Sequence, residues 1–431
     1  MHVIPPPAAS ADELMDHVGA GTSVIVPVGN GEPVAILDAI EAAADASQLD
    51  GVRIHQLLPV RARKHHSGCF GDQLRHVSYF LNASLREHYE RGEVDLVPND
   101  FHAVPAMLRR LEQPLLAVAA SPPDAHGYVS LGVAGDYAAA LLGEMPVIVE
   151  VNASMPRTQG EHTFRLADAA GWVERDTPMV AVPPASGTDV DRRIAELVAQ
   201  RIPDGCVLQF GVGAVPDLVA GLLGDHRDLG IHTELLGDGI MGLIESGAAN
   251  GHTKTREHGL ATTTTIMGSA ALYDWAHEHP GVYVLPVDIS NDPRVIAEHG
   301  DFASVNATMQ IDLLGQCDSE SLGSHYVSST GGQADFMRGA QLAARGQSFI
   351  VTHSTAHDVA SGTVVSRIVP TLSPGSVVTA HKNLVDKVVT EHGVAELTGR
   401  TTRERATGLI AIADPAFRDD LAAEARAMGL C

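Results

Sequence analysis

The sequence has 431 residues, which is enough for two domains with hydrophobic cores of their own. It is 45% hydrophobic and 19% charged, a composition that excludes extensive disorder. The net charge of −24, from 53 acidic against 29 basic residues, repels nucleic acid and anionic membranes, so we expect neither as a partner.

The cysteines and the first residues indicate the compartment. Cys69, Cys206, Cys317 and Cys431 lie far apart in the sequence, which fits neither a disulfide framework nor a Cys-x-x-Cys metal site. The first 20 residues contain no basic segment followed by an apolar run, and no later run approaches the roughly 18 apolar residues of a membrane span. We therefore expect a cytoplasmic protein that is neither exported nor held in a membrane.

The first predicted elements lie in residues 20–58. A β-rich run, TSVIVPV, is followed by a glycine turn at residues 29–33, an amphipathic helix pattern, VAILDAIEAAA, and a second strand candidate, VRIHQLL. This order is that of a βαβ unit, which predicts a parallel sheet.

The same order recurs at residues 205–236. The strand candidate CVLQF is followed by a glycine turn at residues 211–216, the helix pattern DLVAGLL and the strand candidate GIHTELL. Residues 54–58 of the first copy align with residues 231–236 of the second when one extra residue is allowed. This self-similarity predicts an internal duplication into two α/β halves.

The boundary between the halves is predicted at the segment VPPASGT, residues 182–188. Proline and glycine break regular structure there, and Thr188 or Asp189 is a candidate helix cap before the pattern DVDRRIAELVAQRI. We therefore predict an N-terminal domain of residues 1–184 and a C-terminal domain of residues 185–431.

The glycine turn at residues 211–216 and Glu234 allow two interpretations. A glycine turn that opens a helix presents backbone N–H groups to an anion or a developing oxyanion. Glu234 follows Gly213 by 21 residues, which suits a dinucleotide site, although Pro216 stands where a third small residue should allow close packing. Alternatively, Glu234 is a nucleophile that attacks a carbonyl beside these amides. The residues alone leave both interpretations open.

Two later segments carry further polar groups. The motif STGGQADF, residues 329–336, is another glycine turn between a β-like run and a helix pattern, so a second set of backbone amides is expected there. Asn306 lies in the polar segment SVNAT within strand-forming surroundings, where ordinary turn chemistry is the alternative reading.

Several ordered segments together resemble one known family. They are SPPDAHGYVSLG (121–132), VNASMPRTQG (151–160), LGIHTELLGDG (229–239), SNDPRVIA (290–297), GQCDSESLG (315–323), GGQADFMRGA (331–340) and VVTEHGVAELTGRTTRERA (388–406). The sequence resembles the acetyl-CoA hydrolase/transferase family, and most closely its 4-hydroxybutyrate or butyrate–acetate type of CoA-transferase. The resemblance extends over nearly the whole chain.

The resemblance implies two similar open α/β domains with mainly parallel sheets and an active site in the cleft between them. It implies that Glu234, in the His-Thr-Glu segment of the C-terminal domain, is catalytic and that Asn306 lies close to the exchanged carboxylate. The residues expected to bind the cofactor or the oxyanion are Gln209, Gly211, Val212, Gly213, Gly331 and Gly332, with Gly331 also counted as catalytic. Members commonly have glycine two positions before the Gly-Gly pair, where this chain has Ser329.

The reaction implied is CoA transfer by a ping-pong mechanism. Glu234 would form an acyl-glutamyl anhydride and then a glutamyl-CoA thioester, and a second carboxylic acid would reverse the steps. An acyl-CoA hydrolase would use the same glutamate, with water attacking the anhydride. An NAD-linked dehydrogenase and a non-catalytic CoA-binding module are the remaining alternatives.

Expected partners follow from the same resemblance. Acyl-CoA and small carboxylates are the expected substrates, no cofactor is expected to be tightly bound, and a homodimer is the expected assembly. Lys254, with Arg256, is a candidate for the CoA phosphates, against the alternative of solvated surface charge. No metal site is expected, because the mechanism needs none and His277 and His279 are spaced i, i+2, which on a helix do not face each other.

Overall fold

The computed structural model describes residues 4–183, 186–211, 213–358 and 362–430. The chain folds into two compact units: unit 1 comprises Met1–Pro183, Glu234–Leu236 and Thr262–Ser290, and unit 2 comprises Pro184–Thr233, Gly237–Ala261 and Asn291–Cys431. The predicted boundary between residues 184 and 185 falls outside the described residues.

The two units are interleaved along the chain. Glu234 and residues 262–290 were predicted to belong to the C-terminal domain, whereas both belong to unit 1. The reason is strand pairing, because β16 (Val282–Val284) is parallel to β8 (Gln159–Gly160), and an isolated bridge joins Ala134 to Thr265.

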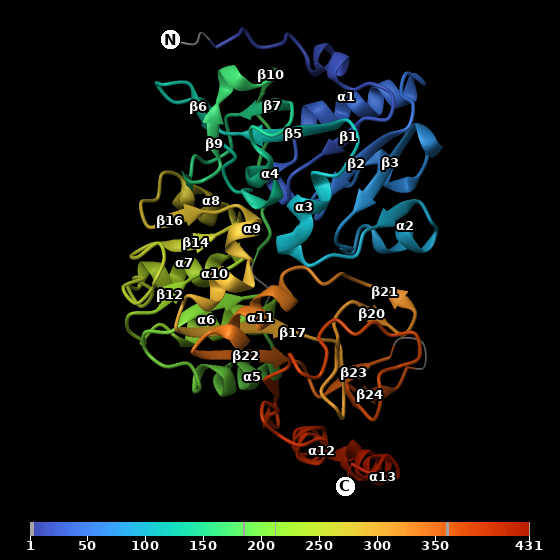
Figure 1. Cartoon of the computed structure of the whole chain (residues 1–431), viewed down its shortest axis with the longest axis vertical. Helices are drawn as coiled ribbons and strands as arrows, with labels where there is room; N and C mark the ends of the chain where they lie inside the picture. The colour runs from blue at the N-terminus through green and yellow to red at the C-terminus, as the bar shows by residue number, and fades with distance from the viewer. Residues whose placement is uncertain (1–3, 184–185, 212, 359–361, 431) are drawn as a thin grey trace. The chain divides into compact units, whose positions relative to one another are not determined.

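Unit 1 is built on a seven-stranded parallel sheet in the order β10-β7-β5-β1-β2-β3-β4. The strands are β1 (Ser23–Ile25), β2 (Val52–Gln56), β3 (Leu74–Ser78), β4 (Val94–Leu96), β5 (Pro114–Ala120), β7 (Val147–Asn152) and β10 (Gly171–Arg175). α1 (Val34–Asp45) lies on one face of this sheet, and α3 (Val104–Leu108) and α4 (Asp136–Leu141) lie on the other; all three are labelled in Figure 1. Because both faces are covered, β5 and β7 consist almost entirely of buried residues, as is usual in parallel sheets.

Alternate strand residues divide the core of unit 1 between these faces. On one face α1 (Val34–Asp45) buries Ile36 and Ile40 against Val24 and Ile54. The other face carries Ile25 and Leu116 in a cluster with residues of the helices α3 and α4. The helices of this unit are α1, α2 (Arg86–Glu90), α3 (Val104–Leu108), α4 (Asp136–Leu141), α8 (Ala270–Ala276) and α9 (Val287–Ser290).

Unit 2 contains a six-stranded sheet in the order β12-β11-β17-β22-β26-β27. The strands are β11 (Val207–Phe210), β12 (Gly230–Ile231), β17 (Asp301–Ala307), β22 (Arg345–Val351), β26 (Lys387–Thr390) and β27 (Gly393–Glu396). All pairs are parallel except β26 with β27. The helices are α5 (Asp189–Ala199), α6 (Ala214–Leu222), α7 (Asp238–Glu245), α10 (Pro293–Ala297), α11 (Gln333–Leu342), α12 (Thr402–Ala411) and α13 (Arg418–Ala427).

Short elements complete the chain. The small strands are β6 (Tyr128–Ser130), β9 (Thr163–Arg165), β13 (Leu235–Leu236), β14 (Ala261–Thr263), β15 (Thr265–Ile266), β18 (Gln310–Asp312), β19 (Cys317–Asp318), β20 (Ser321–Leu322), β21 (His325–Tyr326), β23 (Thr355–His357), β24 (Val364–Ser366) and β25 (Ile368–Val369). The 3₁₀ helices are η1 (Ala11–His17), η2 (Gly29–Gly31), η3 (Lys64–Ser67), η4 (Gly71–Gln73), η5 (Phe101–Ala103), η6 (Leu166–Asp168) and η7 (Pro415–Phe417).

The structure confirms the predicted α/β class with mainly parallel sheets and both predicted βαβ units. β1 and β2 flank α1 and are parallel, and β11 and β12 flank α6 and are parallel. Thr188, one of the two predicted caps, begins α5 with a capping box in which its side chain and that of Asp191 each accept a backbone N–H of the other residue.

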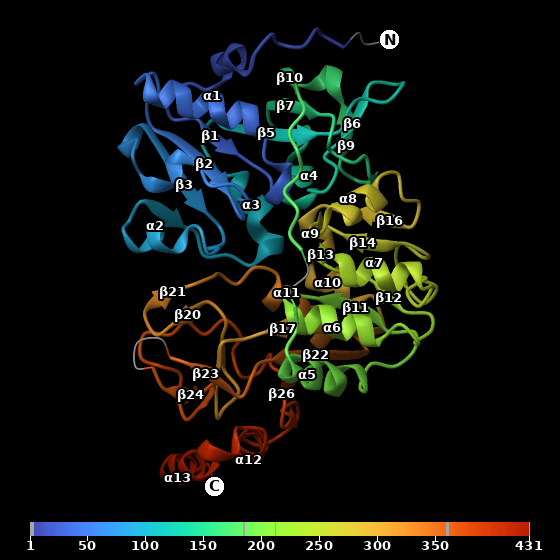
Figure 2. The same ribbon diagram turned by 180° about the vertical axis from the view of Figure 1, so that it is seen from behind.

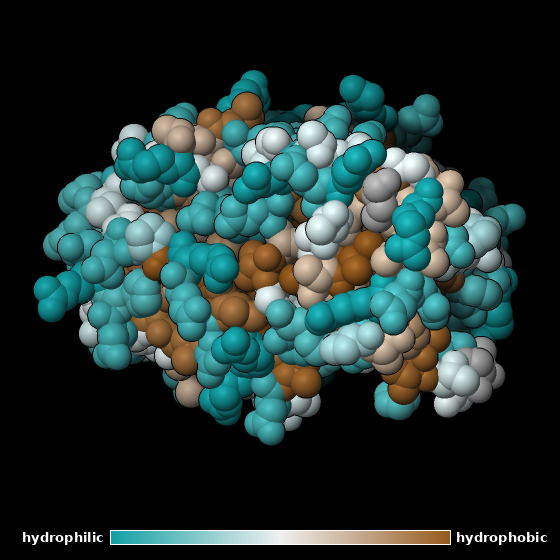
Figure 3. All heavy atoms as spheres, turned by 90° about the horizontal axis from the view of Figure 1, so that it is seen from below, coloured by the Kyte–Doolittle hydropathy of each residue, from teal (hydrophilic) through white to brown (hydrophobic). Residues whose placement is uncertain are grey.

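The distribution of hydrophobic residues can be followed on one face of the surface and along the helices. Seen from below, hydrophobic residues are interspersed among hydrophilic ones (Figure 3). Among the described residues, no helix combines the length and the apolar character needed to cross a bilayer.

A close contact between α11 and β22 fixes where this helix lies. A Cβ at Gly346, in β22, would overlap the carbonyl oxygen of Ala340 in α11. We expect Gly346→Ala to lower the free energy of unfolding by about 1–3 kcal/mol or more, because backbone must move to admit the methyl group. Chemical denaturation measures the change.

Gly242→Ala is the matched control. Gly242 lies inside α7, and a Cβ there meets no atom within 4 Å. Its replacement should stabilise by about 0.5–1 kcal/mol through helix propensity. Equal effects of the two substitutions would show that the contact at Gly346 is not tight.

Candidate active site

The strand order of unit 2 reverses between β11 and β17. β12 lies on one side of β11, whereas β17, β22 and β26 follow on the other side. In open α/β sheets, ligands bind outside the carboxyl ends of the strands at such a reversal. The candidate residues Gln209, Gly211, Gly213 and Asn306 all lie at this edge, which we call the carboxyl edge of unit 2.

Gln209 and Asn306 are joined by two hydrogen bonds. Gln209 Nε2 donates to Asn306 Oδ1 over 3.2 Å, and Asn306 Nδ2 donates to Gln209 Oε1 over 3.0 Å. Both side chains are buried. Each amide retains a second N–H, which can reach a ligand, and the reciprocal pair holds both groups in fixed orientations. The sequence analysis named both residues without foreseeing that they are partners.

Two glycine turns lie at the carboxyl edge of unit 2. The first, which contains Gly211 and Gly213, lies against this amide pair. Gly211 N donates to Val305 O over 2.8 Å, and a Cβ at Gly211 would stand 3.1 Å from Asn306 Oδ1, closer than nearly all natural contacts. Gly213 has φ of +130°, which favours glycine, and begins α6. The turn therefore brings main chain and a helix N-terminus to Asn306. Val212, also predicted to bind the cofactor, lies outside the described residues.

The second glycine turn begins α11. Gly331 has φ of +56°, and Gly332 is the N-cap of the helix. Since α11 packs on β17 and β22 and its last turn meets the start of β22, its N-terminus lies toward the carboxyl edge. Figure 2 shows α11 beside β17 from behind.

Two buried polar atoms flank this second turn. Ser329 Oγ and Gln333 Nε2 have no hydrogen-bond partner among the described residues. An unpaired buried polar group costs roughly 1–3 kcal/mol, so such groups call for a ligand or water. At position 329, where the resemblance leads us to expect glycine, this chain has a serine hydroxyl.

A cavity of about 190 Å³ opens beside the first turn. Its walls include Gly213, Thr308, His353, Asp191 and Arg367. His353 Nε2 and Asp191 Oδ1 are 2.7 Å apart. Burial raises the pKa of Asp191, but hydrogen bonds from Thr188 and His353 outweigh it and leave the pKa below its ordinary value.

Arg367 supplies positive charge to this cavity. Its Nε is buried and bonds to no described residue, and burial lowers the pKa of the guanidinium, although Arg remains protonated. Arg367 and His353 were not predicted as site residues, because both lie in loops with no motif. The scarcity of lysine was the one available signal, since it leaves anions to arginine.

Glu234 belongs to unit 1 and is partly buried. Its main-chain oxygen accepts from Thr264 N over 3.2 Å, Thr265 N over 3.0 Å and Thr263 Oγ1 over 3.0 Å, so its backbone is firmly held. The preceding residue, Thr233, is hydrogen bonded through Oγ1 to the main chain of Phe210, which precedes Gly211. The catalytic role of Glu234 stays a prediction.

Lys254 lies elsewhere in unit 2. Its side chain is 3% exposed, Nζ donates to Leu260 O over 2.8 Å, and its stem contacts Gly230. Gly230 pairs with Val207, the first residue of β11, so Lys254 is at the edge opposite the cavity. Arg256 is paired with Glu257 and Glu298. The structure therefore does not bring Lys254 to the other predicted residues.

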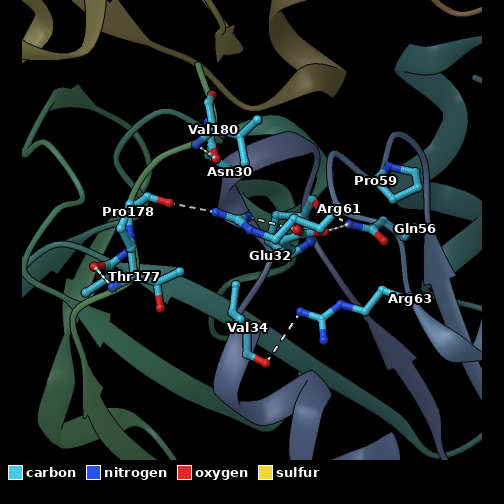
Figure 4. A network of polar contacts seen from close by, with 12 residues as sticks. Asn30, Glu32, Val34, Gln56, Pro59, Arg61, Arg63, Thr177, Pro178 and Val180 are labelled. Atoms are coloured by element: carbon cyan, nitrogen blue, oxygen red, sulfur yellow. Dashed lines mark hydrogen bonds and ion pairs between the residues drawn. The ribbon is translucent and has the colours of Figure 1, made fainter. Parts of the chain in front are cut away.

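The glycine turn of unit 1, at residues 29–33, is filled by the protein's own side chains (Figure 4). Glu32 accepts from Arg61 over 2.8 Å and from Gln56 over 3.2 Å, and Asn30 exchanges two hydrogen bonds with the main chain of Val180. Its polar groups are satisfied internally, so this turn is structural.

Comparisons with known proteins cover both halves. Residues 7–182 match the acetyl-CoA hydrolase/transferase N-terminal domain, and residues 268–425 match the C-terminal domain of the same family. A succinyl-CoA:cyclohexane-1-carboxylate CoA transferase of Geobacter metallireducens is 39% identical over 95% of this chain and 93% of its own. A 4-hydroxybutyrate coenzyme A transferase of Clostridium kluyveri is 37% identical over 96% and 95%. The crystal structure of RipA from Yersinia pestis matches 98% of each chain with a TM-score of 0.92 and 35% identity.

Because Lys254 is buried, we expect the free energy of unfolding to depend on pH. Burial lowers its pKa from 10.5 to about 7, only partly offset by Glu257. Between these pH values the unfolded chain binds a proton that the folded chain does not, so the free energy of unfolding should rise with pH by up to about 1.4 kcal/mol per unit.

Lys254→Met removes this dependence. The difference in unfolding free energy, wild type minus variant, should therefore climb from pH 7 to about pH 9 in urea denaturation. Lys382→Met, at an exposed position, is the control and should give a flat difference. A flat difference for Lys254→Met as well would mean that the amine is solvated in the folded protein.

Proposed function

Because the chain belongs to the acetyl-CoA hydrolase/transferase family, we propose that it is a CoA-transferase that moves coenzyme A from an acyl-CoA to a small carboxylic acid. The observation that carries the proposal is that relatives matched over nearly the whole chain are named CoA transferases. We propose acyl-CoA and carboxylate as its substrates and a homodimer as its assembly.

In the proposed mechanism Glu234 is the nucleophile. Its carboxylate attacks the thioester carbonyl, the C–S bond breaks, and CoA leaves as thiolate from an acyl-glutamyl anhydride. The thiolate then attacks the glutamyl carbonyl, which forms a glutamyl-CoA thioester and frees the first carboxylate. A second carboxylate attacks this thioester and runs the steps in reverse. The firmly bonded main chain of Glu234 supports this role, because it limits the positions that the carboxylate can take.

Stabilisation of the oxyanion is assigned to the carboxyl edge of unit 2. The amides of the turns at Gly211 and Gly331 and the second N–H of Asn306 are donors that need no rearrangement during the reaction. Fixed donors of this kind typically contribute about 10²–10³ each in rate. The bonds between Thr233 and Phe210 support the assignment, because they tie the residue before the nucleophile to the residue before the first turn.

We assign the cavity beside the first turn to an anionic group of CoA, with Arg367 in place of Lys254 as its cation. Arg367 lines the cavity and its buried Nε has no partner among the described residues, whereas Lys254 is bonded to Leu260 at the opposite edge. A guanidinium suits phosphate oxygens because its planar donors match them.

Hydrolysis is the second candidate, since the family name includes hydrolases and water would attack the same anhydride. Acyl-CoA incubated with and without acetate separates the two reactions. Release of CoA that needs no added carboxylate would identify a hydrolase; exchange that needs acetate identifies the transferase.

Glu234→Gln should lower the rate of CoA exchange by at least roughly 10³-fold, because the amide is not a nucleophile. Glu234→Asp keeps the charge but withdraws it by one methylene, and should cost on the order of 10². Glu245→Gln changes an exposed acid close in the sequence; it is the control and should leave the rate unchanged.

Wild type that is incubated with acyl-CoA and then quenched should carry CoA on Glu234, which mass spectrometry would detect. An active Glu234→Gln variant would refute the mechanism.

Arg367→Gln should raise KM for acyl-CoA by about 10–100-fold with little change in kcat, since a charged hydrogen bond contributes roughly 1.5–3 kcal/mol. Arg345→Gln is the matched control, because Arg345 lies at the opposite edge, paired with Asp301. Steady-state kinetics with varied acyl-CoA decide the point. A drop in kcat at unchanged KM would assign Arg367 to the chemical step instead.

A further inference from the structure

Three histidines of unit 1 form a buried cluster that the proposed reaction does not use. His65 and His66 lie in η3, and His76 lies in β3. One ring nitrogen of each lies within 4.8 Å of the others, and the side chains are 0–2% exposed. No metal site was expected from the sequence, because the implied mechanism needs none and the spacing of His277 and His279 does not suit one; here a 3₁₀ helix and a strand bring three other histidines together.

Salt bridges and hydrogen bonds along α1 explain why η3 lies where it does. Arg63 bonds to Asp38 over 2.6 Å, Lys64 to Asp45 over 2.7 Å, and His65 to Glu41 over 2.7 Å. The three acids are spaced i, i+3 and i+7, which places them on one face of the helix. The segment that carries His65 and His66 is thereby held along α1.

His76 approaches from the sheet. It pairs in register with Ile54 of β2 and Val94 of β4, so its side chain points to the same face as Ile54, which α1 covers. The rings of His65 and His66 are 5.4 Å and 4.7 Å from that of His76, between centroids.

Four of the six ring nitrogens of this cluster lack partners among the described residues. His65 Nε2, His66 Nε2 and both ring nitrogens of His76 are buried and make no hydrogen bond to any described residue. A cluster that served only to fill the core would be built of apolar side chains, because each unpaired polar atom is costly to bury. The arrangement is what a ligand would satisfy.

Glu41 fixes the tautomer that metal binding needs. Its carboxylate can only accept, so His65 donates from Nδ1 and keeps its lone pair on Nε2, the ring nitrogen that has no partner among the described residues. A carboxylate on the far nitrogen of a ligating imidazole is the usual outer partner in zinc sites.

We propose that His65, His66 and His76 bind one divalent transition-metal ion of the zinc class. Three imidazoles fill three positions of a tetrahedral ion, and water or another small ligand takes the fourth. Ligand nitrogens of such an ion are about 3.3 Å apart at a metal–nitrogen distance of about 2.0 Å, so the rings close by up to about 1.5 Å on binding. The ion ties η3 to β3, while Glu41 ties the same site to α1.

Metal content and Co²⁺ binding test the site. The chain is prepared without an affinity tag of histidines, stripped with a chelator, and titrated with Co²⁺, with absorption and mass spectrometry of the metal as readouts. Wild type should bind one ion with the spectrum of a tetrahedral nitrogen site, and Zn²⁺ should displace it and raise Tm. Wild type that binds no Co²⁺, or shows an octahedral aqueous spectrum, would overturn the proposal.

Variants separate this site from others on the surface. His66→Gln and His76→Gln should abolish the tetrahedral spectrum. Glu41→Gln keeps all three ligands and should weaken Co²⁺ about 10–100-fold, so it serves if the ligand variants fail to fold. The double variant His252→Gln, His258→Gln removes a stacked pair of exposed histidines in unit 2 and should bind as wild type does. Unchanged binding by Glu41→Gln together with its loss from the double variant would also overturn the proposal.

Discussion

Parallel pairing brings the carboxyl ends of neighbouring strands to one edge of a sheet, and the site in unit 2 depends on this constraint. β11 and β17 lie side by side where the strand order reverses. The segments that follow the two strands therefore run in different directions, which keeps this edge open to a ligand. Gln209 and Asn306, almost a hundred residues apart in the chain, become hydrogen-bonded neighbours there. The glycine at 211 is then required, because a side chain at that position would press on the Asn306 amide.

The two glycine turns show how one βαβ plan supports two outcomes. In unit 1 the polar side chains of the turn are hydrogen bonded within the protein: Glu32 accepts from Arg61 and Gln56, and Asn30 donates to main chain. In unit 2 the corresponding turn faces an amide pair, a cavity and an arginine. Topology therefore determines where a site can form, and the side chains at the carboxyl ends of the strands determine whether a ligand can bind there.

The sequence predicts well whatever depends on local pattern. Alternation of apolar residues and the turn glycines were sufficient for both βαβ units, and the proline-rich segment with Thr188 was sufficient for the start of α5. Contacts between distant residues escaped prediction. Lys254 was predicted to meet the CoA phosphates or to be a solvated surface charge, yet its stem packs on Gly230 and its amine bonds to main chain. The histidine cluster was missed for the same reason, since His76 is brought to His65 only by strand pairing.

The interleaving of the units has a consequence for how the protein can be divided. A gene cut in the linker near residue 184 would yield a first fragment without β13, β15 and β16, all of which pair or bridge within unit 1. β8 would then expose an unpaired edge, and such edges invite association with other chains. Unit 1 therefore needs residues from both sides of such a cut, so the first fragment would lack part of its own fold.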